Sequence, residues 1–141
     1  MEYDEHLERI IGLLNRVSNI HFQSQFRTLE LGHSQAKTLY YIYLKKKVLP
    51  KQIAEYFQLD KGSVTSLIKG LEKNGFLIRE THPTDNRCFY LKISTKAEEV
   101  IPEIEKVLSD WSHILQNGFS EKEKQTLNQL MKRMIKNVSA I

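Results

Sequence analysis

A run of hydroxyl and ammonium side chains lies near the middle of the chain. Hydroxyl groups donate hydrogen bonds to phosphates and to the edges of nucleic-acid bases, and lysines neutralise phosphate charge. A glycine in such a run lets the backbone approach a bound polyanion closely. The ordinary alternative is the polar, solvent-facing side that every amphipathic helix has. The residues concerned are Lys61, Gly62, Ser63, Thr65, Ser66, Lys69 and Lys73.

A second charged feature follows in the segment "HPTDNRCFYLKIS", from His82 to Ser94. Turn-forming residues open the segment and apolar and polar residues then alternate, which predicts a hairpin tip followed by a strand. Arg87 at this tip has the chemistry to enter a narrow DNA minor groove, whose negative potential attracts arginine. The carboxylate of Asp85 could accept hydrogen bonds from Arg87 or Arg79 and fix the guanidinium group. An exposed turn with a weak local ion pair is the alternative.

The positive charge of the chain is concentrated in its centre. From Ser34 to Lys96 there are 12 Lys and Arg against 5 Asp and Glu, whereas the rest of the chain has 9 against 12. The formal net charge is +4 and the sequence pI is near 9.1. A basic centre between acidic flanks suits a polyanionic partner, although a lysine-rich solvated surface has the same composition.

Length and composition predict a globular protein with one main core. The chain has 141 residues, of which 40% are hydrophobic, and no stretch approaches the roughly 20 apolar residues of a membrane helix. The N-terminal "MEYDEHLERI" lacks the apolar run of a signal peptide. The single cysteine, Cys88, cannot form an internal disulfide, which agrees with a reducing compartment. We therefore expect a soluble cytoplasmic protein that does not enter a membrane.

Four helices are expected in the first half of the chain. Apolar residues at spacings of three and four predict the first over residues 5–26, with Asp4 as its N-cap. A second helix is expected to start at Ser34, which would be its N-cap. A short third helix, "PKQIAEYF", begins at Pro50, because proline suits the first helical turn. Asp60 is predicted to cap the fourth helix, which Gly75 would end.

Two strands and two helices are expected to follow. The strands are "FLIRETH" and "RCFYLKIS", on either side of "PTDN". The first of the two helices runs from about Thr95 to Asn117 and contains Pro102. The second starts at Ser120, where "SEKE" predicts a capping box with Glu123. The fold class predicted is mainly α with a small β-hairpin.

The short third helix, the tight turn and the capped fourth helix match helix-turn-helix geometry. The second helix of such a pair usually enters the major groove by its N-terminal half. A hairpin that follows it can act as a wing over the neighbouring minor groove. Arg87, oriented by Asp85, would then enter the minor groove, and Arg79 would support the wing. The major groove would be contacted by Lys61, Ser63, Thr65, Ser66 and Lys69, with Gly62 allowing close approach.

Three stretches of the chain resemble the MarR family of bacterial and archaeal transcriptional regulators. They are "IAEYFQLDKGSVTSLIKGLEKNGFLIRE", the "DNR" that contains Asp85 and Arg87, and "LKISTKAEEVIPEI". The resemblance covers essentially the whole chain and implies a homodimer that binds a palindromic operator, usually as a repressor that a small ligand releases. It implies a dimerisation helix in residues 1–30, a winged helix-turn-helix in 31–95, and C-terminal dimerisation helices in 96–141.

The remaining reactive side chains give weaker signals. The aromatic set His21, Tyr40, Tyr43 and Trp111 could line an effector pocket, although a plain hydrophobic core is the alternative. Cys88 could be a redox sensor because the neighbouring arginine would lower its thiol pKa. The five histidines show no close metal-ligand spacing, and no catalytic motif is present. We therefore expect no metal, no cofactor and no enzymatic activity.

Two functional alternatives stay open at the level of sequence. One is a winged-helix module that binds another protein instead of DNA, in which the hydroxyl and lysine side chains would be incidental. The other is a DNA-binding dimer that has no effector. Phosphate contacts make affinity fall steeply with salt, so salt dependence separates the first alternative from a DNA-binding regulator.

Overall fold

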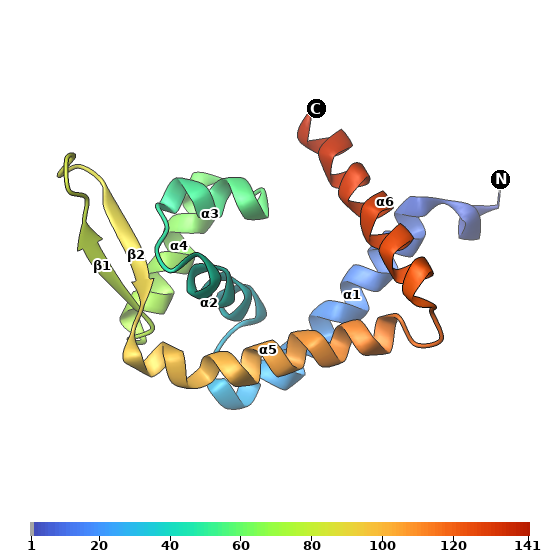
Figure 1. Ribbon diagram of the computed structural model, residues 1–141, viewed down its shortest axis with the longest axis horizontal. Coiled ribbons are helices and arrows are strands. Elements are labelled where there is room, and N and C mark those ends of the chain that lie inside the picture. Colours follow the sequence, from blue (N-terminus) through green and yellow to red (C-terminus); the bar gives the residue numbers. More distant parts are fainter. Residues whose placement is uncertain (1) are drawn as a thin grey trace. The chain divides into compact units, whose positions relative to one another are not determined.

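The computed structural model describes residues 2–141, which form six α-helices, two short 3-10 helices and one hairpin (Figure 1). None of the helices within these residues combines the length and the apolar character that crossing a membrane requires. In chain order the elements are η1 (Tyr3–Glu5), α1 (Leu7–Phe26), η2 (Arg27–Leu29), α2 (His33–Lys45), α3 (Pro50–Phe57), α4 (Lys61–Lys73), β1 (Leu77–Thr81), β2 (Phe89–Ile93), α5 (Thr95–Leu115) and α6 (Glu121–Ser139).

The chain forms two compact units, Met1–Val107 and Leu108–Ile141, and the boundary between them falls inside α5. The first unit contains the helix-turn-helix, the hairpin and the main hydrophobic core. The second contains the end of α5 and all of α6. The division by function into residues 1–30, 31–95 and 96–141 stays a prediction.

The helix-turn-helix forms through local capping, with Pro50 and Asp60 at the positions that the sequence predicted. Pro50 is at the start of α3, and the side-chain oxygen of Gln52 accepts a hydrogen bond from the backbone N–H of Leu49 at 2.7 Å. Gln58 ends α3 in the left-handed conformation, with φ of 54°. Asp60 then caps α4, since its carboxylate accepts from the backbone N–H of Ser63 at 2.7 Å. These local bonds set the direction in which α4 leaves the turn.

Strands β1 and β2 pair antiparallel, with Leu77 opposite Ile93 and Thr81 opposite Phe89. A third segment joins them at the base of the hairpin, because Val48 and Leu91 exchange backbone hydrogen bonds of 3.1 and 2.7 Å. The side chains of Val48 and Leu91 are both completely buried. The hairpin is therefore fixed at its base to the segment between α2 and α3, while its tip extends freely (Figure 1).

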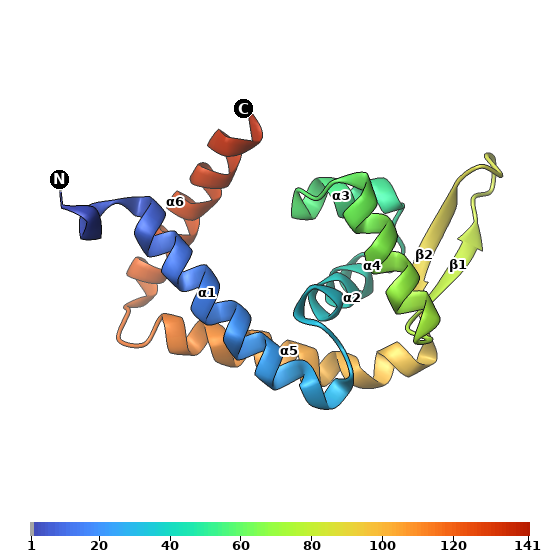
Figure 2. The same cartoon turned by 180° about the vertical axis from the view of Figure 1, so that it is seen from behind.

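The core of the first unit lies where α2, α3, α4 and the base of the hairpin meet. Figure 2 shows α4 between α2 and the hairpin. The apolar stripe of α4 faces inward and its opposite side is exposed, as predicted. The fully buried large side chains are Phe26, Thr38, Leu39, Ile42, Val48, Ile53, Leu71, Leu91 and Ile104.

Two predicted helix starts are wrong. Helix α1 begins at Leu7 after His6, and Asp4 instead forms an ion pair with Arg9 at 3.1 Å. Helix α2 begins at His33, so that Ser34 lies inside it. The reason is that the longer side chain of Gln35 reaches back to the backbone N–H of Gly32 at 3.0 Å and satisfies the helix start.

The C-terminal helices agree more closely with the prediction. Helix α5 accommodates Pro102 inside it, and α6 starts with a capping box. The backbone N–H of Glu123 donates to Ser120 Oγ at 3.1 Å, and the backbone N–H of Ser120 donates to Glu123 Oε1 at 2.8 Å. No side chain of α6 is buried within this single chain.

The burial of Leu91 provides a direct test of how the hairpin is anchored. We expect Leu91→Ala to lower the free energy of unfolding by about 3 kcal/mol, because it removes buried methyl groups and leaves a cavity. Ile78 lies in the same sheet but is 49% exposed, so Ile78→Ala should cost less than about 1 kcal/mol. Chemical denaturation of both variants measures the difference. Equal losses would contradict the anchoring of the hairpin at Leu91.

Candidate nucleic-acid interface

All six residues predicted to contact the major groove are exposed on one side of α4. Val64, Ile68 and Leu71 occupy the opposite, buried side. The helix therefore presents its polar groups outward along its N-terminal half, the part that enters the major groove in helix-turn-helix proteins. The exposed residues are Lys61, Gly62, Ser63, Thr65, Ser66 and Lys69.

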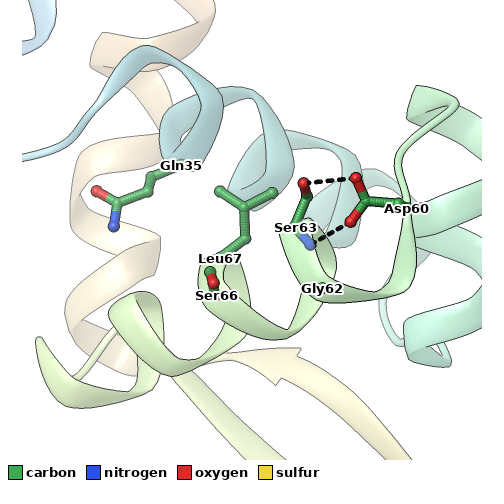
Figure 3. Close-up of a pocket in the computed structure, with 6 residues that line it drawn as sticks. All are labelled: Gln35, Asp60, Gly62, Ser63, Ser66 and Leu67. Carbon is green, nitrogen blue, oxygen red and sulfur yellow. Dashed lines mark hydrogen bonds between the residues drawn. The ribbon is translucent and has the colours of Figure 1, made fainter.

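Two of the hydroxyl groups on α4 already donate hydrogen bonds within the chain. Ser63 Oγ donates to Asp60 Oδ2 at 3.1 Å (Figure 3), and Thr65 Oγ1 donates to the backbone oxygen of Lys61 at 2.9 Å. The two bonds from Ser63, of which the backbone bond is the stronger cause, hold the pKa of the Asp60 carboxyl below its usual value. The hydroxyl oxygens of Ser63 and Thr65 therefore face outward as acceptors, which suits amino groups on base edges.

A shallow depression lies between α2 and the start of α4 (Figure 3). It is lined by polar residues of both helices, and Gln35 on α2 is the contribution that sequence reasoning missed. A methyl group added at Gly70 would lie 2.9 Å from Gln35 Nε2, so the two helices approach closely at this point. The lining residues are Gln35, Asp60, Gly62, Ser63, Ser66 and Leu67.

A groove of about 610 Å³ lies between the helix-turn-helix and the hairpin. Its apolar lining comes from Pro50, Ala54, Val64, Ile68 and Phe89. Five cationic side chains from α3, α4 and the hairpin also line it, and no acidic side chain does. These are Lys51, Lys61, Lys69, Arg79 and Arg87. A groove lined by five cationic side chains and no acidic one suits a phosphodiester backbone.

Arg79 joins the hairpin to α4. Its guanidinium donates two hydrogen bonds to Glu72, of 2.7 Å from Nε and 2.9 Å from Nη2, and lies 4.0 Å from the centre of the Phe89 ring. The hydrogen bonds from Arg79 hold the pKa of the Glu72 carboxyl below its usual value. Of the two arginines predicted as alternative partners of Asp85, Arg79 therefore pairs with Glu72 instead, and its supporting role for the wing stays a prediction.

Asp85 pairs with Arg87 at the tip of the hairpin. Its Oδ1 accepts from the backbone N–H of Arg87 at 3.0 Å and from Arg87 Nε at 3.2 Å. The side chain of Arg87 is 88% exposed, so it is available to a partner. Its hydrogen bonds to Asp85 are the main reason that the carboxyl pKa lies below its usual value. This arrangement holds the guanidinium in place without burying it.

The surroundings of Cys88 differ from those expected of a reactive thiol. Desolvation, followed by the adjacent Asp85 carboxylate, raises the thiol pKa above its usual value, which outweighs the opposite effect of Arg87. Cys88 Sγ donates to Asp85 Oδ2 at 3.6 Å. A raised pKa lowers the thiolate fraction and therefore the reactivity. The sequence shows the arginine next to Cys88, whereas the contact with the Asp85 carboxylate is seen only in the folded turn.

The structure brings together two of the four residues predicted to line an effector pocket. Tyr40 and Tyr43, one turn apart on α2, stack with ring centres 6.2 Å apart. His21 on α1 makes an edge-on contact with Phe22. Trp111 belongs to the second unit. The effector pocket therefore stays a prediction.

Residues 2–141 contain no group of three or more His, Cys, Asp or Glu side chains placed to hold a metal ion. Among the groove residues, sequence reasoning missed Lys51 and Phe89. Lys51 lies in the first turn of α3, ten positions before Lys61, and no local pattern indicates that the two lysines share a groove.

The exposed polar helix, the groove and the anchored hairpin define a winged helix-turn-helix protein. Residues 31–89 match the family model of MarR. The chain is 26% identical over 97% of its length to the HTH-type transcriptional regulator BilQ of Clostridioides difficile (strain CD3), covering 88% of that protein. The chain is thus similar in sequence to MarR-family proteins and to HTH-type transcriptional regulators.

Solved structures agree with this fold. A MarR protein from Peptoclostridium difficile DA00132 superposes with a TM-score of 0.89 at 26% identity, over 96% of this chain and 88% of that one. A putative MarR-family regulator from Listeria monocytogenes, solved with a 26mer DNA, superposes with a TM-score of 0.92 at 22% identity, over 96% and 91% of the two chains. The likeness to the second structure concerns the fold alone.

The ion pair between Glu72 and Arg79 gives a pH-dependent prediction. The pKa of Glu72 is lower in the folded protein than its ordinary value of 4.5, so its contribution to stability is present above that value and lost as pH falls through the folded-state pKa. We expect Glu72→Gln to lower the free energy of unfolding at neutral pH by about 1 kcal/mol or less, because solvent screens the half-exposed arginine.

Urea denaturation of both proteins over a pH series measures this effect. The difference between wild type and Glu72→Gln should shrink as the solution becomes more acidic than pH 4.5. Glu55→Gln is the matched control, since Glu55 forms a longer, 3.8 Å pair with an exposed lysine. A Glu72→Gln difference that stays constant in acid would argue against the pair as the cause.

Proposed function

We propose that this protein is a repressor that binds a palindromic operator as a homodimer and responds to a small-molecule effector. The observation that carries the DNA-binding part is the groove that Arg87 shares with Lys61, Thr65 and Lys69 of α4. A helix in the major groove and a wing in the adjacent minor groove would together follow a single phosphate backbone. As a regulator of transcription, the protein would act in the cytoplasm.

The side chains on the exposed side of α4 suit different kinds of contact with DNA. Its exposed side carries lysines and hydroxyl groups but no Arg, Asn or Gln, the residues that recognise guanine or adenine by two hydrogen bonds. Lys61 and Lys69 would mainly neutralise phosphates. Ser63, Thr65 and Ser66 would contact base edges one hydrogen bond at a time. Arg87 would add recognition of minor-groove width.

The apolar surfaces of α1 and α6 support a homodimer. On α1 the side chains of Leu7, Ile10, Ile11, Leu14 and Val17 are all at least 41% exposed. On α6 the exposed apolar side chains are Leu130, Met131, Ile135 and Val138. Each set lies on one side of its helix, and a second copy of the chain would remove both sets from water. Contiguous exposed apolar patches of this kind mark protein interfaces.

A dimer would place two copies of α4 against two half-sites about one helical turn, roughly 34 Å, apart. An effector that favours one arrangement of the dimer would change this spacing, and the operator would fit only one spacing. The predicted pocket residues for such an effector are His21, Tyr40, Tyr43 and Trp111. A thermal-shift screen tests for the effector, since a ligand that binds only the folded state raises the melting temperature.

Arg87→Ala tests the role of the wing. We expect the variant to bind DNA from upstream of its own gene about tenfold more weakly than wild type, because a minor-groove contact is lost. Fluorescence anisotropy at several salt concentrations, beside a scrambled duplex, measures this change. Arg27→Ala, which removes an exposed arginine from η2 in the same unit, is the control and should bind like wild type.

The outcomes of that experiment separate the alternatives. Unchanged binding by Arg87→Ala would show that the wing does not contact DNA. Wild-type binding that is specific and strongly salt-dependent is the result expected of the regulator. No binding even at low salt would overturn the DNA-binding proposal and favour a winged-helix module for a protein partner.

Ile135→Glu tests the homodimer. Ile135 is 59% exposed on α6 within one chain, so a glutamate there should leave the isolated fold intact. In a dimer interface it would bury a charge, and we expect the variant to be monomeric. Light scattering after gel filtration measures the mass. Ile78→Glu, which changes a residue of similar exposure in β1, is the control and should stay dimeric. A dimeric Ile135→Glu protein would exclude this face of α6 from the interface.

A further inference from the structure

The imidazole ring of His82 lies inside the turn at the tip of the hairpin. Its Nδ1 atom is 3.3 Å from the backbone nitrogen of Thr84 and 3.2 Å from that of Asp85. Both backbone groups are donors, so Nδ1 accepts both bonds with its lone pair and the ring proton resides on Nε2. The neutral ring thus takes the place that an Asn or Asp side chain usually has in a turn of this kind.

The ring is held in this position from its other side. It stacks on Tyr90 of β2, with ring centres 5.2 Å apart and planes 22° apart. The ammonium of Lys47 lies 4.5 Å from the centre of the Tyr90 ring and 3.1 Å from the Glu80 carboxylate. The orientation of His82 therefore follows from packing against the body of the hairpin.

The same turn sets the position of Arg87. Asp85 donates its backbone N–H to His82, and its carboxylate accepts from both the backbone and the guanidinium of Arg87. The backbone oxygen of Asp85 accepts from the N–H of Cys88 at 3.1 Å. Asp85 thus links the imidazole ring of the histidine to the arginine, while the backbone N–H of His82 separately donates to the backbone oxygen of Cys88 at 3.4 Å. A change at Nδ1 therefore alters the residue that orients Arg87.

We propose that His82 is a positioning residue for DNA binding, whose neutral ring holds the wing tip in the conformation that presents Arg87, and whose protonation releases it. This inference rests on the proposed function of the wing. A protonated Nδ1 carries a hydrogen and cannot accept, so the N–H groups of Thr84 and Asp85 lose their partner. DNA affinity then falls as the solution is acidified.

The charged groups around His82 lead to the same result. An Asp85 side chain that turned to accept from a protonated Nδ1 would leave the guanidinium of Arg87. Arg87 and Lys47 are the neighbouring cations, and Glu80 is already paired with Lys47 and Lys92. Tyr90 and Cys88 complete the surroundings of the ring. Thr84 Oγ1 lies 3.4 Å from Nδ1 and can accept from a protonated ring, but the backbone N–H groups of Thr84 and Asp85 still lose their acceptor.

Two substitutions separate the effect of the hydrogen bonds to Nδ1 from the effect of the stacked ring. His82→Asn keeps a side-chain oxygen that can accept from the same turn but does not titrate. His82→Phe keeps the stack on Tyr90 and removes the acceptor. Between about pH 8 and pH 5, the range in which histidines titrate, we expect wild-type affinity for the upstream duplex to fall about fivefold relative to His82→Asn, which matches the loss of one hydrogen bond. His82→Phe should bind weakly at every pH.

Amide NMR spectra of the free protein give a second measurement that does not depend on DNA. The backbone resonances of Thr84 and Asp85 should shift together with the ring resonances of His82, and should not shift in His82→Asn. The role of His82 would be overturned if the amide resonances of Thr84 and Asp85 did not shift with the ring resonances of His82. It would also be overturned if the DNA affinity of His82→Asn followed the wild-type pH profile. Amides that follow the ring in a protein that binds no DNA at any pH would instead overturn the proposed function.

Discussion

The position of the wing relative to α4 depends on the burial of Leu91 against Val48. Leu91 is the centre of β2, its side chain is completely buried, and its backbone exchanges two hydrogen bonds with Val48. A hairpin of two strands has little stability in water unless it packs on something else. This contact joins the hairpin to the segment from which α3 begins, and so gives the wing a fixed base.

Further contacts lie between that base and the exposed tip of the hairpin. Arg79 joins β1 to Glu72 on α4 and covers the ring of Phe89, which makes one wall of the basic groove. Nearer the tip, the conformation of the hairpin depends on hydrogen bonds among His82, Asp85 and Arg87. The wing therefore passes from buried apolar packing at its base to an exposed polar turn at its tip.

The charged side chains near the groove fall into two groups. Cations from three different elements line the groove without an acidic partner in it, whereas the acidic groups nearby, Glu72 and Asp85, are each used to orient an arginine. Opposite charges that hold a guanidinium at the surface contribute little to stability because solvent screens them. Their effect is to fix geometry, which a protein that recognises a regular polyanion requires.

The sequence by itself determined the helices, the hairpin and the exposed side of α4. Capping by Asp60 and Ser120 and the apolar stripe of α4 act over three or four residues, so the local sequence contains all the information they need. At the start of α2, Ser34 and Gln35 are both local candidates to cap the helix, and the prediction that Ser34 is the N-cap was wrong. Tertiary structure alone decided that Lys51 and Phe89 join the groove and that Arg79 pairs with Glu72. These outcomes depend on which distant segments pack together, and that is fixed by burial of the whole core and not by the spacing of residues along the chain.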